Sequence, residues 1–329
     1  MTATTLVEDM LAGDRRALAR LMTLVENGHP ETATILSTVH ARCGRAYTIG
    51  VTGPPGAGKS TLVDRLIGTL RAQGHRVGII AIDPSSPFSG GAVLGDRIRM
   101  QSHYLDDDVF IRSMSTRGSH GGLARATRHI AQLLDAFGKD FIQIETVGVG
   151  QTELDVMRLA HTTIVVLVPE AGDTVQTMKA GLLEIADVLV VNKADREGAT
   201  RIKTELEMML QLRPGSKWTV PVLLTQANEG TGVAELLDTV SRHRAFRDSS
   251  GASHAQNAAA RLGDFLAALS DEIGRRVQVG VEDGRFAAQL QAIRRGEIDP
   301  YAAALQIIED EASMRALLCA APATASTKT

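Results

Sequence analysis

The chain has 329 residues, of which 44% are apolar and 22% are charged, and its net charge is −3 at pH 7. This composition is typical of a soluble globular protein with one large or two modest domains. It gives no electrostatic basis for binding nucleic acid or an anionic membrane, and no apolar run has the length of a membrane span. Cys43 and Cys319 are far apart and the N-terminus lacks a signal pattern, so we expect a cytoplasmic protein without disulfides.

Residues 1–44 are predicted to form a helical extension. Leu18, Leu21 and Val25 recur at helical spacing, and a Gly-His-Pro sequence at 28–30 ends this run. A second helix is predicted from residue 31 to about residue 42. The extension precedes a segment in which strands and helices are predicted to alternate.

Residues 45–245 alternate between short apolar runs and helical segments. The predicted strands are 47–51, 77–83, 141–145, 162–168, 186–192 and 220–225. Because their apolar residues are continuous, these strands are expected to be buried on both faces. Strand–helix alternation of this kind predicts an α/β fold with a doubly wound, mainly parallel sheet. Ligands bind such sheets at the carboxyl ends of the strands, where Asp83, Glu145 and Asn192 fall.

The loop after the first predicted strand fits the pattern GxxxxGK[ST], which is typical of a P-loop. It consists of Gly53, Pro54, Pro55, Gly56, Ala57, Gly58, Lys59 and Ser60. Its backbone N–H groups and the following helix start favour phosphate. We expect Lys59 to reach the β- and γ-phosphates, Ser60 to bind Mg²⁺, and Thr61 to approach the α-phosphate. The alternative is a chance glycine-rich turn.

The next predicted strand, 77–83, follows the first helix after only a tight turn, which makes it parallel to the strand before the P-loop. Ras-like GTPases have an antiparallel strand at this place. The arrangement therefore favours the other main branch of P-loop GTPases, the SIMIBI type.

The NKAD sequence at 192–195 predicts guanine specificity. Asp195 can accept hydrogen bonds from N1–H and the 2-amino group of guanine, a donor pair that adenine lacks. Asn192 is expected to tie this loop to its neighbours, and the Lys193 stem to lie along the base. Read alone, NKAD could instead be a capped helix start. Gln226 and Ala227 follow the last strand, where a backbone N–H can read guanine O6, although a plain connecting loop fits them nearly as well.

Three carboxylates are candidates for magnesium binding and catalysis: Asp83, Asp96 and Glu145. An acid at a strand end that faces the P-loop can hold Mg²⁺ through water or position a nucleophilic water. The alternative is capping of a local loop for Asp83 and Asp96, and a strand-end carboxylate satisfied by the local backbone for Glu145. Glu145 begins ETVG, so Gly148 occupies the place where a switch glycine senses the γ-phosphate. Val149 follows, where Ras-like proteins have a water-positioning Gln, and we therefore expect slow intrinsic hydrolysis.

Residues 246–329 are predicted to begin with a polar linker and to continue as a helical arm with a disordered tail. One helix face carries Leu262, Phe265, Leu266, Leu269, Ile273 and Val277. Asp299 and Pro300 predict the start of another helix. Two or three helices bury little by themselves, so this arm is expected to pack back or to meet a second subunit.

Several stretches together resemble the MeaB/ArgK family of GTPases, the chaperones of adenosylcobalamin-dependent methylmalonyl-CoA mutase. The P-loop and NKAD are common to GTPases, whereas AIDPSSPFSGGAVLGDRIRM, ETVGVGQTE and PEAGDTVQTMKAGLLEIAD are specific to the family. The resemblance is dense over about residues 45–245, and the helical ends also fit the family.

The resemblance implies a GTP hydrolase with Mg²⁺ that gates cofactor loading of the mutase and protects or reactivates that enzyme. It places the magnesium and switch carboxylates at Asp83, Asp96 and Glu145. It also assigns coupling to the mutase to a loop with Asp173, Gln176 and Lys179, which chemistry alone leaves undecided. The implied partners are the mutase, a second copy of the chain through residues 246–329, and the adenosyltransferase as a further candidate. No cobalamin motif is visible, so no directly bound cobalamin is expected.

The sequence leaves two other functions open. One is a kinase or ATPase that serves amino-acid transport, a label sometimes given to this family. Asp195 argues against it, because adenine would leave that carboxylate unpaired. The other is a metal-insertion GTPase, which the absence of a His-rich tract or a CxxC motif disfavours.

Overall fold

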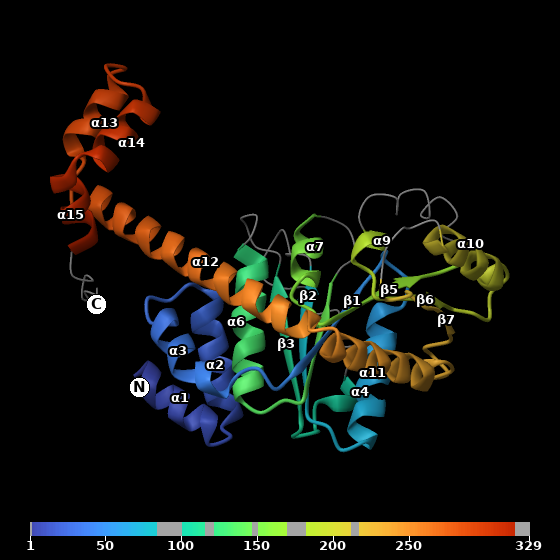
Figure 1. Cartoon of the computed structure of the whole chain (residues 1–329). Coiled ribbons are helices and arrows are strands. Elements are labelled where there is room, and N and C mark those ends of the chain that lie inside the picture. Colours follow the sequence, from blue (N-terminus) through green and yellow to red (C-terminus); the bar gives the residue numbers. More distant parts are fainter. Residues whose placement is uncertain are drawn as a thin grey trace. The chain divides into compact units, whose positions relative to one another are not determined.

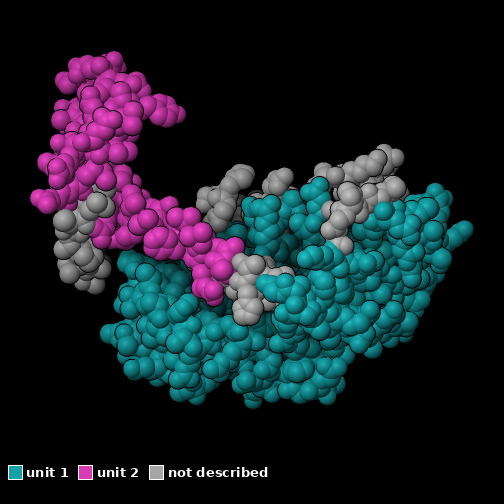
Figure 2. All heavy atoms as spheres, viewed as in Figure 1, with its two compact units in different colours: residues 1–253 teal, residues 254–329 magenta. Residues whose placement is uncertain are grey.

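The computed structural model describes residues 2–83, 101–115, 122–146, 151–169, 182–211 and 217–319. The chain divides into two compact units, residues 1–253 and 254–329, which Figure 2 shows in different colours. None of the helices within the described ranges is both long and apolar enough to cross a membrane.

A seven-stranded sheet is the centre of the first unit, with the strand order β3-β2-β4-β1-β5-β6-β7 (Figure 1). All of its paired neighbours are parallel, so the prediction of a doubly wound parallel sheet is confirmed. The strands are β1 (Tyr47–Thr52), β2 (Val77–Asp83), β3 (Val109–Ser115), β4 (Phe141–Glu145), β5 (Thr162–Leu167), β6 (Val188–Asn192) and β7 (Val222–Thr225). Strand β3, at the edge of the sheet, was not among the predicted strands.

Helices cover both faces of the sheet, because successive strand residues point to opposite faces and both sets are apolar. On one face, α4 (Lys59–Ala72) and α11 (Val233–Ser249) pack with Ile49, Val51 and Ile79. On the other face, α6 (Gly122–Ala136) packs with Ile80 and Ile142. The remaining elements are η2 (Gln101–His103), α7 (Gln151–Met157), α9 (Leu182–Ile185) and α10 (Ala199–Gln211).

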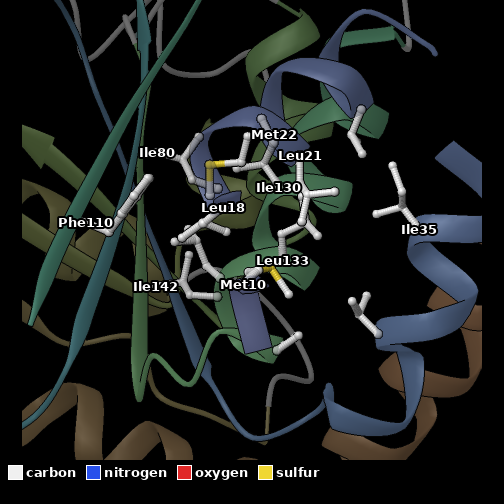
Figure 3. Packing of buried hydrophobic residues seen from close by; sticks show 14 of the residues in the cluster. Met10, Leu18, Leu21, Met22, Ile35, Ile80, Phe110, Ile130, Leu133 and Ile142 are labelled. Atoms are coloured by element: carbon white, nitrogen blue, oxygen red, sulfur yellow. The ribbon is translucent and has the colours of Figure 1, made fainter. Parts of the chain in front are cut away.

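The N-terminal extension forms three helices and a short 3₁₀ helix: α1 (Ala3–Leu11), α2 (Arg15–Glu26), α3 (Thr32–Val39) and η1 (His40–Arg42). The single helix expected before residue 28 is in fact two. Gly13 adopts a φ of +103°, and the Asp14 carboxylate then caps α2 by accepting from Arg16 and Ala17 N–H. Buried side chains of this extension share one cluster with α6 and the sheet (Figure 3).

Polar side chains are buried or half-buried at the amino ends of β1, β5 and β6. The hydroxyls of Tyr47 and Thr162 share a hydrogen bond of 2.6 Å, and the Thr162 hydroxyl is also bonded to Nδ1 of His243 at 2.8 Å. Nε2 of His243 lies 3.4 Å from Oδ1 of Asp187. The other Asp187 oxygen accepts from the backbone N–H of Thr163 at 2.8 Å. We call Tyr47, His161, Thr162, Asp187 and His243 the amino-edge cluster.

Burial shifts the pKa of three members of the amino-edge cluster. It lowers the pKa of His161 and of His243 to about 4, with nearby Arg247 acting in the same direction. It raises the pKa of Asp187 to about 6. His161 is held by Thr48, whose N–H donates to Nδ1 at 2.9 Å. The histidines are therefore neutral in the folded protein near pH 7.

The second unit is helical. It contains most of α12 (Ala252–Glu282), followed by α13 (Ala287–Arg294), α14 (Pro300–Glu309) and α15 (Glu311–Cys319). The predicted polar linker is wrong, because only Ser250 and Gly251 separate α11 from α12. The predicted start of α14 is confirmed, with Asp299 accepting from Tyr301 and Ala302 N–H. The apolar face predicted for α12 is exposed at Leu262, Phe265, Leu266, Leu269, Ile273 and Val277.

Candidate functional site

The carboxyl ends of β1, β4, β6 and β7 bring most of the predicted site residues to one edge of the sheet. The P-loop follows β1, Glu145 ends β4, and Asn192 ends β6. Five predicted residues lie outside the described ranges: Asp96, Gly148, Asp173, Gln176 and Lys179. Asp83 ends β2, and the position of its side chain is likewise outside the description.

Two glycines of the P-loop have no room for a side chain. Gly53 adopts a φ of +140°, and a Cβ there would lie 2.0 Å from the carbonyl oxygen of Val166. Gly58 adopts a φ of +87°, and its Cβ would lie 2.4 Å from Nδ2 of Asn192. The loop therefore passes directly against β5 and the NKAD segment, which only glycine permits.

Helix α4 begins at Lys59 without a side-chain N-cap, because Gly58 stands at the capping position. The N–H groups of a first helical turn need acceptors from outside the helix, and anions supply them well. The Lys59 ammonium donates to the carbonyls of Gly53 at 2.8 Å and Pro54 at 3.1 Å. Glycine geometry, an uncapped helix start and a lysine folded over the loop form a setting suited to phosphate.

Ser60 and Glu145 join the P-loop helix to the end of β4. The Ser60 hydroxyl donates to Oε1 of Glu145 at 2.6 Å, and both residues are buried. Hydroxyl and carboxylate oxygens are the ligands that Mg²⁺ prefers, so this pair fits a magnesium site beside the phosphates. Asp83 lies on the adjacent strand, two residues beyond Ala81, which is in register with Glu145.

The residue after Glu145 is also fixed to β1. The Thr146 N–H donates to the Val51 carbonyl at 3.1 Å, and its hydroxyl donates to the Thr52 hydroxyl at 2.9 Å. Thr146 is the first residue past β4, so the segment that follows begins at a defined point next to the P-loop. The sequence offered no signal for this pair of threonines beyond their place at two strand ends.

Asn192 connects three loops. Its Nδ2 donates to the Ala57 carbonyl of the P-loop at 2.8 Å. Its Oδ1 accepts from the Thr225 hydroxyl at 3.0 Å and from the Ala227 N–H at 3.1 Å. With only 2% of its surface exposed, Asn192 holds together the P-loop, the NKAD segment and the loop after β7.

The rest of the NKAD segment turns toward solvent. Lys193 is the one non-glycine residue with a positive φ in the described part of the chain, at 57°. This left-handed conformation costs about 1 kcal/mol for a residue with a side chain. It is followed by Asp195, which is exposed. The strained turn thus presents a carboxylate at the rim of the site, where a base could reach it.

The loop after β7 is closed on itself and on α4. The Gln226 N–H donates to the Thr231 carbonyl at 3.0 Å, so the N–H groups of Gln226 and Ala227 both have protein acceptors in this structure. Arg65 of α4 donates to the carbonyls of Ala227, at 3.1 Å, and Asn228. Arg65 was missed from the sequence, because a surface arginine within a helix carries no sign of its distant partner.

Comparison with known proteins agrees with this geometry. A family model described as methylmalonyl Co-A mutase-associated GTPase MeaB matches residues 18–281. A putative GTPase of Pyrococcus abyssi is 48% identical over 309 residues, which cover 93% of this chain and 95% of that protein. The mitochondrial methylmalonic aciduria type A homolog of Mus musculus is 36% identical over 250 residues, which cover 70% of this chain and 60% of the mouse protein.

Among solved structures, the crystal structure of a LAO/AO transport system kinase matches with a TM-score of 0.67 and 27% identity, covering 94% of this chain and 97% of that one. Its similarity extends over the P-loop domain and the helical ends. With a family model that matches most of its length and a relative at 48% identity over nearly the whole chain, this protein belongs to the MeaB family of GTPases.

Proposed function

We propose that the chain is a cytoplasmic, magnesium-dependent GTPase that times the loading of adenosylcobalamin into methylmalonyl-CoA mutase and protects or reactivates that enzyme. The observation that carries the proposal is the 2.6 Å hydrogen bond from Ser60 to Glu145. It connects the phosphate loop to the start of the ETVGVGQ segment, one of the stretches specific to this family.

The proposal gives the main site residues separate tasks. Lys59 and the N-terminus of α4 bind the phosphates and stabilise the charge that develops on them during transfer. Ser60, Glu145 and Asp83 hold Mg²⁺, which when bound neutralises phosphate charge. Asp195 selects guanine, and Asn192 holds the segment that carries Asp195 against the P-loop.

Slow hydrolysis without a partner is part of the same proposal. Residue 149, next to the switch glycine at 148, is Val and cannot orient a water through a side-chain amide. We therefore assign acceleration to binding of the mutase, through the segment that contains Asp173, Gln176 and Lys179. The roles of Asp96 and Gly148 in this switch are proposed on the same basis.

We also propose that the functional form is a homodimer. Six large apolar side chains are exposed along one face of α12, from 38% at Ile273 to 62% at Phe265. An apolar patch of this continuity marks an interaction site, and a second copy of α12 offers a matching face for a symmetric contact. Sedimentation at micromolar concentration would show a dimer, which Phe265→Glu should convert to a monomer.

The client is tested by capture of purified methylmalonyl-CoA mutase on the immobilised chain with GTP, GDP or no nucleotide. We expect the amount of captured mutase to depend on the nucleotide and the mutase to increase the GTP turnover rate. Asp195→Asn with GTP serves as the matched control, because it removes base selection at an exposed residue. Equal absence of mutase in all three nucleotide states contradicts the proposal.

A further inference from the structure

Gln143 is a polar residue in the interior of the sheet. It is fully buried in β4 and lies in register with Ile49 of β1 and Ile79 of β2. Its chain neighbours Ile142 and Ile144 belong to the apolar cluster on the α6 face. Gln143 therefore points to the opposite face, beneath α4, which is also the face of Glu145.

Neither polar atom of the Gln143 side chain is hydrogen-bonded. Both Nε2 and Oε1 are buried and have no partner in the described part of the chain. A buried amide without partners destabilises the fold, whereas an apolar side chain of the same size would not. Ile49 and Ile79, which lie beside Gln143 on the neighbouring strands, show that this face of the sheet accepts apolar residues. The presence of this amide, which destabilises the nucleotide-free protein, is explained if the amide gains a hydrogen-bond partner when ligand is bound.

The strand geometry places the Glu145 carboxylate, a hydrogen-bond acceptor, on the same face of β4 as Gln143. Residues two apart on one strand lie about 6.6 Å from each other on the same face, a separation that a Gln and a Glu side chain can bridge by rotamer change. The Ser60 hydroxyl now donates to Oε1 of Glu145. An amide that donates to an ionised carboxylate in a buried setting makes a stronger hydrogen bond than one between neutral groups.

We propose that Gln143 is a positioning residue for the magnesium site, which donates from Nε2 to the Glu145 carboxylate when nucleotide and Mg²⁺ are bound. The inference rests on the proposed magnesium-dependent GTPase function. Replacing a residue that is hydrogen-bonded to a metal-binding carboxylate commonly changes the affinity of the site for the metal. The amide thus lowers the stability of the nucleotide-free protein and raises the affinity of its nucleotide complex for Mg²⁺.

The test uses Gln143→Met, which keeps the length and removes both polar atoms. Ser113→Ala is the matched control, because Ser113 has a buried, unpartnered hydroxyl and lies in the same register row as Glu145, with Ala81 of β2 between them. Two quantities are measured on the full chain: the Tm without nucleotide, and the Mg²⁺ concentration that half-saturates the fluorescence change of bound N-methylanthraniloyl-GDP.

We expect Gln143→Met to raise the Tm by about 2–4 °C and the half-saturating Mg²⁺ concentration about 10-fold, while GDP affinity without Mg²⁺ stays the same. Ser113→Ala should leave the Mg²⁺ dependence unchanged. A Gln143→Met protein with wild-type Mg²⁺ dependence overturns the inference, as does a fall in Tm, which would reveal a stabilising partner in the resting state. A wild-type protein that shows no Mg²⁺ dependence contradicts the proposed function itself.

Discussion

The two ends of the central sheet use polar residues in different ways. At the amino end, the hydroxyls, imidazoles and carboxylate of the amino-edge cluster are buried or half-buried and bonded to one another or to the backbone. At the carboxyl end, Asn192 and the Ser60–Glu145 pair are also buried and bonded, but the P-loop glycines and the uncapped start of α4 lie beside the left-handed Lys193 and the exposed Asp195 at the rim. Groups bonded within the protein stabilise its fold, whereas a helix start that no side chain caps and an exposed carboxylate beside a strained turn are suited to binding a ligand.

This comparison predicts that substitutions at the two ends separate stability from nucleotide binding. At the carboxyl end, changes to backbone geometry should affect both, and changes to exposed side chains only binding. At the amino end, changes should affect stability alone.

Gly53→Ala should have the largest effect. Its Cβ would lie 2.0 Å from the Val166 carbonyl, which belongs to the sheet backbone and cannot move aside. We expect a loss of about 3–5 kcal/mol in the free energy of unfolding and no measurable GDP binding. Urea unfolding and nucleotide fluorescence are the measurements.

Gly56→Ala is the matched control for that substitution. Gly56 also has a positive φ, of 75°, but a Cβ added there would meet nothing within 4 Å. It should cost only about 1 kcal/mol, the strain of a left-handed residue. Equal losses in the two variants would show that close approach to β5 does not shape the P-loop.

Asp195→Asn should come next, with an effect on binding alone. Replacing the exposed carboxylate with an amide keeps an acceptor for N1–H but leaves the 2-amino group of guanine facing a donor, so GDP affinity should fall about 100-fold, or about 2.7 kcal/mol. Xanthine carries an oxygen at position 2, so the variant should bind xanthosine diphosphate better than the wild type does. Competition between the two nucleotides measures the change, and unaltered preference would argue against base reading by Asp195.

The carboxyl end was largely predictable from sequence, because its chemistry depends on short segments. The P-loop and NKAD each lie within a few consecutive residues, and strand ends place them on a common edge. What could not be predicted was how they connect. The contacts of Asn192 with Ala57 and Ala227 join residues far apart in the chain, and nothing local to Asn192 identifies those partners.

The amino-edge cluster and β3 were missed for related physical reasons. Asp187 and His243 lie on separate elements and meet only after the sheet has formed. Strand β3 contains Arg112 and Ser113, so it lacks the continuous apolar run by which the other strands were found. An edge strand needs less apolar surface than a central one, since it has only one neighbouring strand.

His243→Leu should lower stability and leave nucleotide binding unchanged, whereas Asp195→Asn should do the reverse. The substitution removes one partner of the Thr162 hydroxyl and leaves the half-buried Asp187 without its imidazole neighbour. We expect the free energy of unfolding to fall by about 2 kcal/mol, with GDP affinity within twofold of wild type. A large loss of affinity without loss of stability would contradict the division between the two edges.

The smallest predicted effect is the dependence of stability on pH between 6.5 and 5. The histidines at 161 and 243 have a folded pKa of about 4, below the ordinary value of 6.5, so the unfolded chain binds more protons there and acid destabilises the fold. Asp187 opposes them, because its pKa is raised from 3.8 to about 6 and its folded form takes up a proton first.

Two histidines against one carboxyl leave the unfolded chain with about one extra proton at pH 5, which corresponds to a loss of about 1 kcal/mol per pH unit. Urea unfolding at pH 6.5, 5.75 and 5 measures this slope. Asp187→Asn removes the opposing group, so its slope should approach about two protons even though its overall stability is lower. An unchanged slope in Asp187→Asn would mean that Asp187 does not take up a proton in the folded protein. A slope that is flat in the wild type and in Asp187→Asn would mean that the amino-edge cluster does not hold its histidines neutral, and the distinction between the two edges would then rest on the glycines and Asp195 alone.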